Sequence, residues 1–171
     1  MLLSFKEGME ELGRRVCDGC EDLESGHGRW AVYSQAIKDE NEWPGLLELV
    51  KQEPDEAVAS SVVVNLLELL PESRRGDAVA VLPAGKIREN AELRSREISV
   101  LEALSVERAV FDESNLNIRG WSNWLQMRVA VSARRKEILG ALSTAGSTKR
   151  IRNTAKENLR LLLLSGDRDG R

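Results

Sequence analysis

Two cysteines and the single histidine are the residues of this chain whose types and spacing match a metal site. Cys17 and Cys20 are separated by two residues, and His27 follows in the same stretch, which is rich in glycine and acids. A C-x-x-C pair is half of a tetrahedral zinc site, which His27 and a carboxylate such as Asp22 or Glu24 would complete. Because no second Cys/His pair exists, we expect two thiols in a surface turn and assign no metal or cofactor. A labile disulfide is the remaining alternative.

The sequence lacks the constellations of common catalytic sites. His27 has no plausible serine or cysteine partner nearby, and the chain contains neither a glycine-rich phosphate loop nor an H-E-x-x-H motif. Carboxylates are numerous, but on helix faces three or four residues from a base they are typically solvated ion pairs. We therefore expect a protein that is not an enzyme.

Positive charge is concentrated near the C-terminus. Between residues 134 and 160 the only acids are Glu137 and Glu157. The bases in this range are Arg134, Arg135, Lys136, Lys149, Arg150, Arg152, Lys156 and Arg160. On a helix, three of them (Lys149, Arg152 and Lys156) would follow one another on successive turns and form a positive strip for phosphates or acidic side chains. The alternative is an ordinary solvated helix face.

Tryptophan accounts for four of the seven aromatic residues. Trp121 and Trp124 begin a predicted helix beside Gly120, at the edge of the least regular stretch, and are candidate interface anchors. As i and i+3 neighbours on one helix they are alternatively packing residues. Trp30 and Trp43 are assigned to packing.

The basic residues lie on two predicted antiparallel helices between residues 135 and 164. The apolar stripe of the first helix ends before Gly146, where we expect a left-handed C-cap. Ser147 or Thr148 should cap the second helix. The stripes consist of Ile138, Leu139 and Leu142 in the first helix and of Ile151, Ala155, Leu159 and Leu162 in the second.

A second helix pair of this pattern is predicted at residues 43–70. Pro44 suits the first turn of its first helix, and Pro54, Asp55 and Glu56 suit the start of its second. The apolar stripe of that second helix repeats the spacing of four, four and three residues; its members are Val58, Val62, Leu66 and Leu69. The two pairs lie about ninety residues apart, near twice the length of a helical repeat, so we expect a more diverged pair between them.

The remaining segments also show helical periodicity or loop composition. We predict helices at 5–16, 30–37, 77–82, 87–104 and 121–131, a continuation at 106–111, a loop at 17–28 and a linker at 112–120. The run VASSVVV at 58–64 is the one strand-like segment, and its apolar flanks favour a buried helix.

Composition indicates a soluble all-α protein. The chain has 171 residues, 42% hydrophobic and 31% charged, without the period-two alternation of strands. We expect one domain over 1–164, a disordered tail over 165–171, no membrane span or signal peptide, and a cytoplasmic location. Residues 1–72 carry 16 acids and 6 bases, whereas residues 73–171 carry 12 acids and 19 bases. The two parts therefore have net charges of −10 and +7, which suits an acidic partner or self-association through opposite charges.

The two helix pairs resemble HEAT repeats. In such repeats the second helix carries an apolar residue followed by arginine, with a small residue at the fourth position after the first and leucine at the eighth. The matching residues are Ile151, Arg152, Ala155 and Leu159. In the pair at 43–70, Ala59 replaces the arginine and Val62 the small residue. The resemblance implies a right-handed α-solenoid of about four antiparallel helix pairs whose curved face binds proteins or, in some members, nucleic acid.

Together these observations favour a non-catalytic binding module for a protein partner. An adaptor, an inhibitor or an immunity-type protein, of bacterial origin, fits this size and charge pattern. The alternative is an α-solenoid that binds nucleic acid through the basic residues 134–160.

Overall fold

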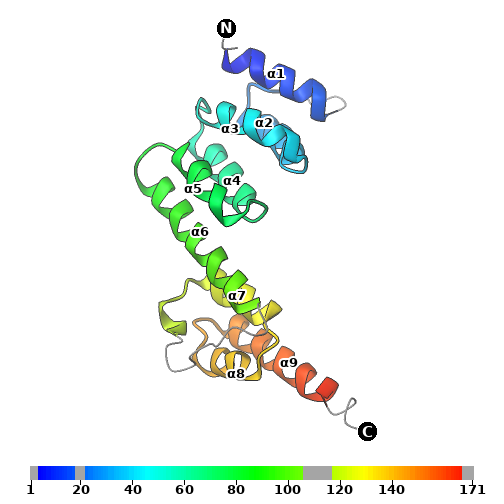
Figure 1. Ribbon diagram of the computed structural model, residues 1–171, viewed down its shortest axis with the longest axis vertical. Helices are drawn as coiled ribbons and strands as arrows, with labels where there is room; N and C mark the ends of the chain where they lie inside the picture. The colour runs from blue at the N-terminus through cyan, green and yellow to red at the C-terminus, as the bar shows by residue number, and fades with distance from the viewer. Residues whose placement is uncertain (1–3, 18–21, 106–116, 167–171) are drawn as a thin grey trace. The chain divides into compact units, whose positions relative to one another are not determined.

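The computed structural model describes residues 4–17, 22–105 and 117–166, and these ranges contain α-helices and short 3-10 helices but no strand (Figure 1). The predicted all-α class is therefore confirmed. The chain divides into two compact units, residues 1–96 and 97–171. The expectation of a single domain stays a prediction.

Unit 1 is a set of short helices that pack on one another in sequence. Its elements are α1 (Phe5–Val16), α2 (Gly26–Ala36), η1 (Glu40–Glu42), α3 (Trp43–Val50), α4 (Glu56–Leu67), α5 (Glu72–Ala80) and the first part of α6 (Lys86–Ser105). Helix α2 packs against α1, α3 and α4, while α1 also contacts α3 and α4 contacts α5. Fully buried core residues include Leu12, Tyr33, Leu46, Val62, Leu66 and Leu82.

Side-chain caps determine where several helices of unit 1 begin. Ser4 and Glu7 form a capping box at α1, and the Asp55 carboxylate accepts the first free backbone N–H groups of α4. Ser25 caps α2, which therefore begins at Gly26 instead of at the predicted residue 30. Composition alone assigned these first residues to a loop, because they include two glycines and few apolar side chains.

Helix α4 confirms the helical interpretation of VASSVVV, but its buried face differs from the predicted stripe. The helix ends at Leu67, so Leu69 leaves the helical period and is 52% exposed. Val58 is only partly buried. The face that enters the core consists of Ala59, Val62, Val63, Leu66 and Leu67, followed by Leu70. The repeat of the four-four-three spacing therefore fails at its last position.

Unit 2 contains the rest of α6 together with η3 (Ile118–Gly120), α7 (Asn123–Ser132), α8 (Lys136–Ala145) and α9 (Lys149–Gly166). Helix α9 packs against both α7 and α8, so the predicted pair at 135–164 is present (Figure 1). The core comprises Ile118, Leu125, Val129, Ala130, Ile138, Leu139, Leu142, Ile151 and Ala155. Leu159 and Leu162 pack on it while partly buried. Helix α9 extends to Gly166, so the predicted disordered tail is wrong at residues 165 and 166, and the rest of that tail, 167–171, lies outside the described residues.

The turn between α8 and α9 corrects one predicted conformation. Gly146 has φ −56°, so it is not left-handed. A Cβ atom here would lie 2.6 Å from the carbonyl oxygen of Leu142 and 2.8 Å from Cγ2 of Ile151, which is why a glycine fits. Thr148, one of the two predicted caps, accepts the backbone N–H of Ile151 at 3.2 Å.

The middle of the chain is helical as predicted, with shifted boundaries. Helix α5 begins five residues before the predicted start at 77, and α6 matches the predicted helix at 87–104 within one residue. The predicted continuation at 106–111 and most of the linker at 112–120 lie outside the described residues. The end of that linker forms η3, where Ile118 is buried.

A recurring contact ties the start of five helices to the backbone that precedes them. The side chain at the third or fourth helical position donates to carbonyl groups five to eight residues upstream. The pairs are Arg29 with Leu23 and Glu24 in α2, Arg75 with Leu67 and Leu70 in α5, Arg88 with Ala80 and Leu82 in α6, Gln126 with Ile118 and Trp121 in α7, and Arg152 with Gly146 in α9. These donors satisfy carbonyl groups that helix ends and turns leave without intrahelical partners.

Candidate functional site

Three predicted site residues form an exposed group of cations on α9. Lys149, Arg150 and Lys156 are exposed and form no ion pair with any residue that the structure describes. Lys149 and Lys156 are seven residues apart, so they lie on the same face of the helix, separated by about 10 Å along its axis. We refer to these three residues as the α9 cations.

Two further bases of the range 134–160, one of them in the predicted strip, have other contacts. The Arg152 guanidinium is partly buried and donates to the carbonyl of Gly146 at 2.6 Å, so it stabilises the end of α8 instead of forming part of an open strip. Arg160 pairs with Glu157 at 2.7 Å on the exposed side of α9. Their hydrogen bond lowers the pKa of the Glu157 carboxyl and raises the pKa of Arg160.

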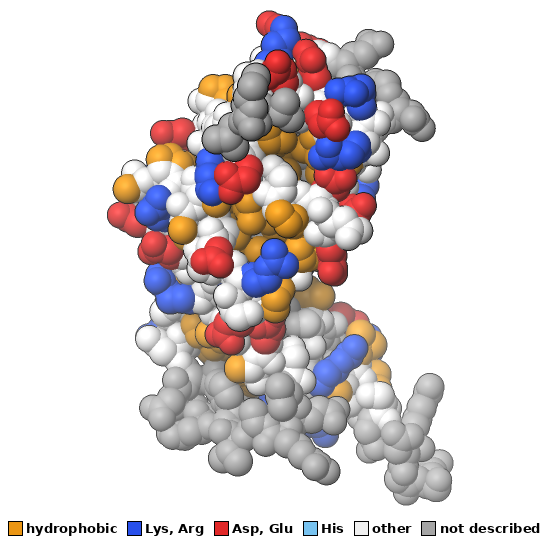
Figure 2. Space-filling model, turned by 45° about the horizontal axis from the view of Figure 1, so that its top comes forward, with side chains coloured by type: hydrophobic (Ala, Val, Ile, Leu, Met, Phe, Trp, Pro, Cys, Tyr) orange, Lys and Arg blue, Asp and Glu red, His pale blue; other side chains and the backbone are white. Residues whose placement is uncertain are grey.

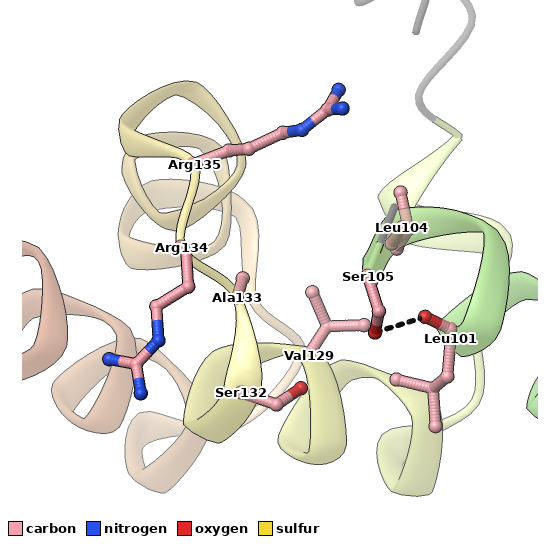
Figure 3. A pocket seen from close by; sticks show the side chains of 8 residues that line it. All are labelled: Leu101, Leu104, Ser105, Val129, Ser132, Ala133, Arg134 and Arg135. Carbon is pink, nitrogen blue, oxygen red and sulfur yellow. Dashed lines mark hydrogen bonds between the residues drawn. The ribbon is translucent and has the colours of Figure 1, made fainter. Parts of the chain in front are cut away.

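Arg134 and Arg135 lie beside a cavity of about 440 Å³ within unit 2. Leu101, Leu104 and Val129 supply much of its apolar lining. In Figure 3 the two arginine side chains point in opposite directions, and Arg135 extends toward the side on which Leu104 lies. The cavity therefore combines an apolar wall with a cationic rim.

The tryptophans of unit 2 take part in packing. Trp121 and Trp124 are partly buried against the unit 2 core. The Arg128 guanidinium lies 5.4 Å from the centre of the Trp124 ring, which is a cation–π distance. The Trp121 carbonyl accepts the Gln126 side-chain amide at 2.9 Å. Both tryptophans thus support the local fold, and their partial exposure leaves the prediction of interface anchors untested.

The candidate metal residues do not assemble into a site among the described residues. Cys17 is disulfide-bonded, so the expectation of two thiols is wrong and the alternative of a disulfide holds. Cys20 lies outside the described residues, and His27 is exposed at the second position of α2. The described part of the chain contains no group of three or more His, Cys, Asp or Glu residues placed to hold a metal ion.

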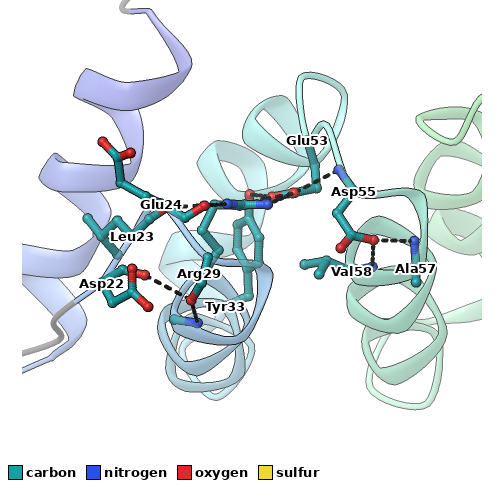
Figure 4. Close-up of polar contacts among 11 residues, drawn as sticks. Asp22, Leu23, Glu24, Arg29, Tyr33, Glu53, Asp55, Ala57 and Val58 are labelled. Atoms are coloured by element: carbon teal, nitrogen blue, oxygen red, sulfur yellow. Dashed lines mark hydrogen bonds and ion pairs between the residues drawn. The ribbon is translucent and has the colours of Figure 1, made fainter.

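A buried ion pair in unit 1 was not predicted. Arg29 donates to the Glu53 carboxylate at 2.8 to 3.0 Å, and the two side chains are 7% and 0% exposed (Figure 4). The Tyr33 hydroxyl and the backbone N–H of Asp55 donate to the same carboxylate, each at 3.0 Å. The pair therefore joins α2 to the loop that begins α4.

The surroundings of this ion pair shift two pKa values. The hydrogen bond to Glu53 raises the pKa of Arg29, which keeps the guanidinium charged. Burial, reinforced by the negative charge of Glu53, raises the pKa of Tyr33 far above its ordinary value, so the hydroxyl remains a donor. Arg29 and Glu53 are 24 residues apart, whereas sequence patterns relate only residues that are close along the chain. The sequence therefore shows two charged residues but does not indicate that they form a pair.

Unit 1 also contains a hollow of about 450 Å³ between α2 and α4, which we call the α2–α4 hollow. It is lined by Gly26, His27, Trp30, Asp55, Ala57, Val58 and Ser61. Trp30, assigned to packing, is only partly buried here, whereas Trp43 is 4% exposed and donates to the Ile37 carbonyl, as a packing residue should.

The residue types in the α2–α4 hollow include those of a hydrolytic triad, but their hydrogen bonds differ. The Ser61 hydroxyl donates to the Ala57 carbonyl at 2.7 Å, and Asp55 accepts backbone N–H groups as the cap of α4. Among the described residues, no hydrogen bond joins His27 to Asp55 or Ser61. The serine therefore has no general base in contact.

Charge is distributed unequally between the two units. Unit 1 contains 19 acids and 12 bases, a net charge of −7, and unit 2 contains 9 acids and 13 bases, a net charge of +4. On the face shown in Figure 2, hydrophobic side chains reach the surface among charged ones of both signs. Exposed large hydrophobic residues include Val131, Leu161, Leu163 and Leu164 in unit 2.

Comparison with protein-family models, curated proteins and solved structures finds no match to this chain. The resemblance to HEAT repeats therefore rests on the residues quoted for it. None of the described helices has both the length and the apolar character that crossing a bilayer requires.

Proposed function

We propose that this protein is a non-catalytic binding module of the helical-repeat type, which recognises an acidic surface of a protein partner through the α9 cations. The observation that carries the proposal is the exposure of Lys149, Arg150 and Lys156 without an acidic partner among the described residues. Surface bases that serve only solubility are commonly interspersed with acids. Lys149, Arg150 and Lys156, in contrast, have no acidic side chain in contact among the described residues of unit 2.

The helical-repeat part of the proposal is supported by the contact that recurs at the start of α2, α5, α6, α7 and α9. Stacked repeat modules share contacts of this kind, because each module must pack against its neighbour in the same way. The arginine of the quoted HEAT-like pattern, Arg152, is one of these donors. A right-handed stack of about four pairs is the arrangement we propose, with adaptor, inhibitor or immunity-type roles for the resulting surface.

Charge reversal of two α9 cations tests the proposal. The double variant Lys149→Glu/Lys156→Glu should keep its circular dichroism spectrum and lose partners that the wild type captures from cell extract, identified by mass spectrometry. Arg152 is left unchanged because it caps α8. The matched control reverses Lys38 and Lys51, which are exposed lysines of unit 1. Equal capture by the wild type and the α9 variant would show that these cations only solubilise the protein.

The second candidate function, nucleic-acid binding, is favoured by the same cations and is distinguished by salt dependence. Three neutralised phosphates would give a slope of about −2.7 in a plot of log affinity against log salt on duplex DNA. A protein complex with apolar contacts would survive moderate salt. Fluorescence anisotropy with labelled duplex and single-stranded DNA makes this measurement.

A further inference from the structure

The α2–α4 hollow is a surface of opposite character to the α9 cations. Helices α2 and α4 pack side by side, and the hollow between their first turns holds about 450 Å³. Gly26 permits this close approach, because a Cβ atom there would lie 2.9 Å from the Asp55 carboxylate and 3.2 Å from Val58.

The chemistry of the α2–α4 hollow suits a cationic side chain on an amphipathic helix. Trp30, Ala57 and Val58 provide an aromatic and apolar lining, and Asp55 contributes a carboxylate, with Glu56 exposed beside it. Among the residues that the structure describes, no lysine or arginine lines the hollow. A cation over a tryptophan face near a carboxylate is attracted by both groups.

Helix α9 carries the complementary pattern on its exposed face. Lys149 and Lys156 are seven residues apart, and Leu163 follows after another seven, so the three share one side of the helix. Leu163 is 48% exposed. The last turn adds Leu161 and Leu164, which are 49% and 53% exposed. A helix with exposed cations and an apolar end can bind in a groove of another protein by helix-in-groove recognition.

We propose that the α2–α4 hollow of one copy binds α9 of a second copy, giving a head-to-tail association between unit 1 and unit 2. The inference rests on the proposed function in taking α9 as the binding helix, and it names a second copy as an acidic partner. The net charges of −7 and +4 favour this pairing of unlike units and oppose the pairing of like units. The contact is heterologous, so one copy contributes the hollow and the other contributes α9.

Sedimentation velocity of the purified full-length chain tests the association. The monomer mass is 19.1 kDa. At about 50 mM salt, the weight-average mass should rise with protein concentration and reach at least twice this value, and it should fall back at about 500 mM salt, where exposed charges are screened. A mass that stays monomeric up to about 1 mM protein at low salt would overturn the proposal.

Two variants and their mixture identify the surfaces. Ser61→Arg places a bulky cation in the hollow, with Asn65→Arg, one turn further along α4 and not in the lining of the hollow, as its matched control. Ser61→Arg and Lys149→Glu/Lys156→Glu should each be monomeric, while Asn65→Arg should associate like the wild type. Mixing the two monomeric variants should restore a dimer, because one supplies an intact α9 and the other an intact hollow.

The possible outcomes test the head-to-tail contact and the proposed function separately. Association that persists in Ser61→Arg, or a mixture that stays monomeric although both variants are folded, would overturn the head-to-tail contact. A wild type that is monomeric but captures another protein through Lys149 and Lys156 would overturn only the self-association and leave the proposed function standing. Self-association through these surfaces without capture of any other protein would restrict the acidic partner to the second copy.

Discussion

Replacing Glu53 by glutamine should destabilise unit 1 strongly. The Glu53 side chain is fully buried and its carboxylate accepts hydrogen bonds from Arg29, from the Tyr33 hydroxyl and from the backbone of Asp55. Glutamine keeps the size of the side chain but removes the negative charge, so the Arg29 guanidinium, 7% exposed, loses its counter-ion.

The magnitude follows from the burial of the pair. Removing one partner of a buried ion pair costs about 3 to 5 kcal/mol, because the other charge remains buried and uncompensated. The amide oxygen of glutamine still accepts one or two hydrogen bonds, which places the expected loss near the lower end, about 3 kcal/mol. Part of this loss concerns the start of α4, since the Asp55 backbone N–H bonds to the same carboxylate.

Urea denaturation followed by circular dichroism measures this loss. The matched control is Glu48→Gln: Glu48 pairs with Lys51, and both side chains are about half exposed. We expect the control to change the free energy of unfolding by less than about 0.5 kcal/mol. Adding Arg29→Met to Glu53→Gln should recover part of the stability, because no unpaired charge remains. A loss below about 1 kcal/mol for Glu53→Gln would refute the assignment of a buried, charged pair.

Three further perturbations have defined outcomes. Ala155→Asp places an unpaired charge at a fully buried position of α9 and should cost more than about 4 kcal/mol, measured by denaturation; an unchanged midpoint would contradict the inward placement. Gly146→Ala introduces a Cβ atom 2.6 Å from the Leu142 carbonyl and should cost about 1 to 3 kcal/mol in the same assay. The pKa of Glu7 lies below its ordinary value because the Ser4 backbone and hydroxyl donate to its carboxylate; this stabilisation is present above the unfolded-state pKa and is lost as the pH falls through the folded-state pKa. An NMR titration should show Ser4→Ala moving the Glu7 pKa upward.

The helices themselves were largely predictable, because amphipathic period and caps are local properties. The pair at 135–164 and the helix at 5–16 follow from apolar spacing, and the helix that contains 58–64 follows from the apolar flanks of that run. The predictions were wrong where helix caps and helix ends, and not the apolar periodicity, determine the structure. Ser25 starts α2 inside a glycine-rich segment, and Leu69 falls outside α4 although it continues the spacing of its stripe.

The candidate surfaces were only partly predictable. Of the predicted strip, Lys149 and Lys156 are exposed, whereas Arg152 is partly buried and bonds to Gly146. The α2–α4 hollow brings together residues that lie about thirty positions apart, such as Trp30 and Val58. A single sequence contains no signal for such long-range proximity, since apolar period and composition describe only neighbours along the chain.

The arginine contacts show why a count of charges describes surfaces poorly. Arg75 is 2% exposed and donates to the carbonyls of Leu67 and Leu70, so its guanidinium is not on the accessible surface of unit 1. The charges of Arg29 and Glu53 cancel within the core. A count over the sequence therefore includes charged groups that are not on the accessible surface of unit 1. Bases that cap a preceding turn are recognisable by their place near the start of a predicted helix. Excluding the capping Arg152, and Arg160 because it pairs with Glu157, leaves Lys149, Arg150 and Lys156 on α9. This is the physical reason for assigning binding to these cations.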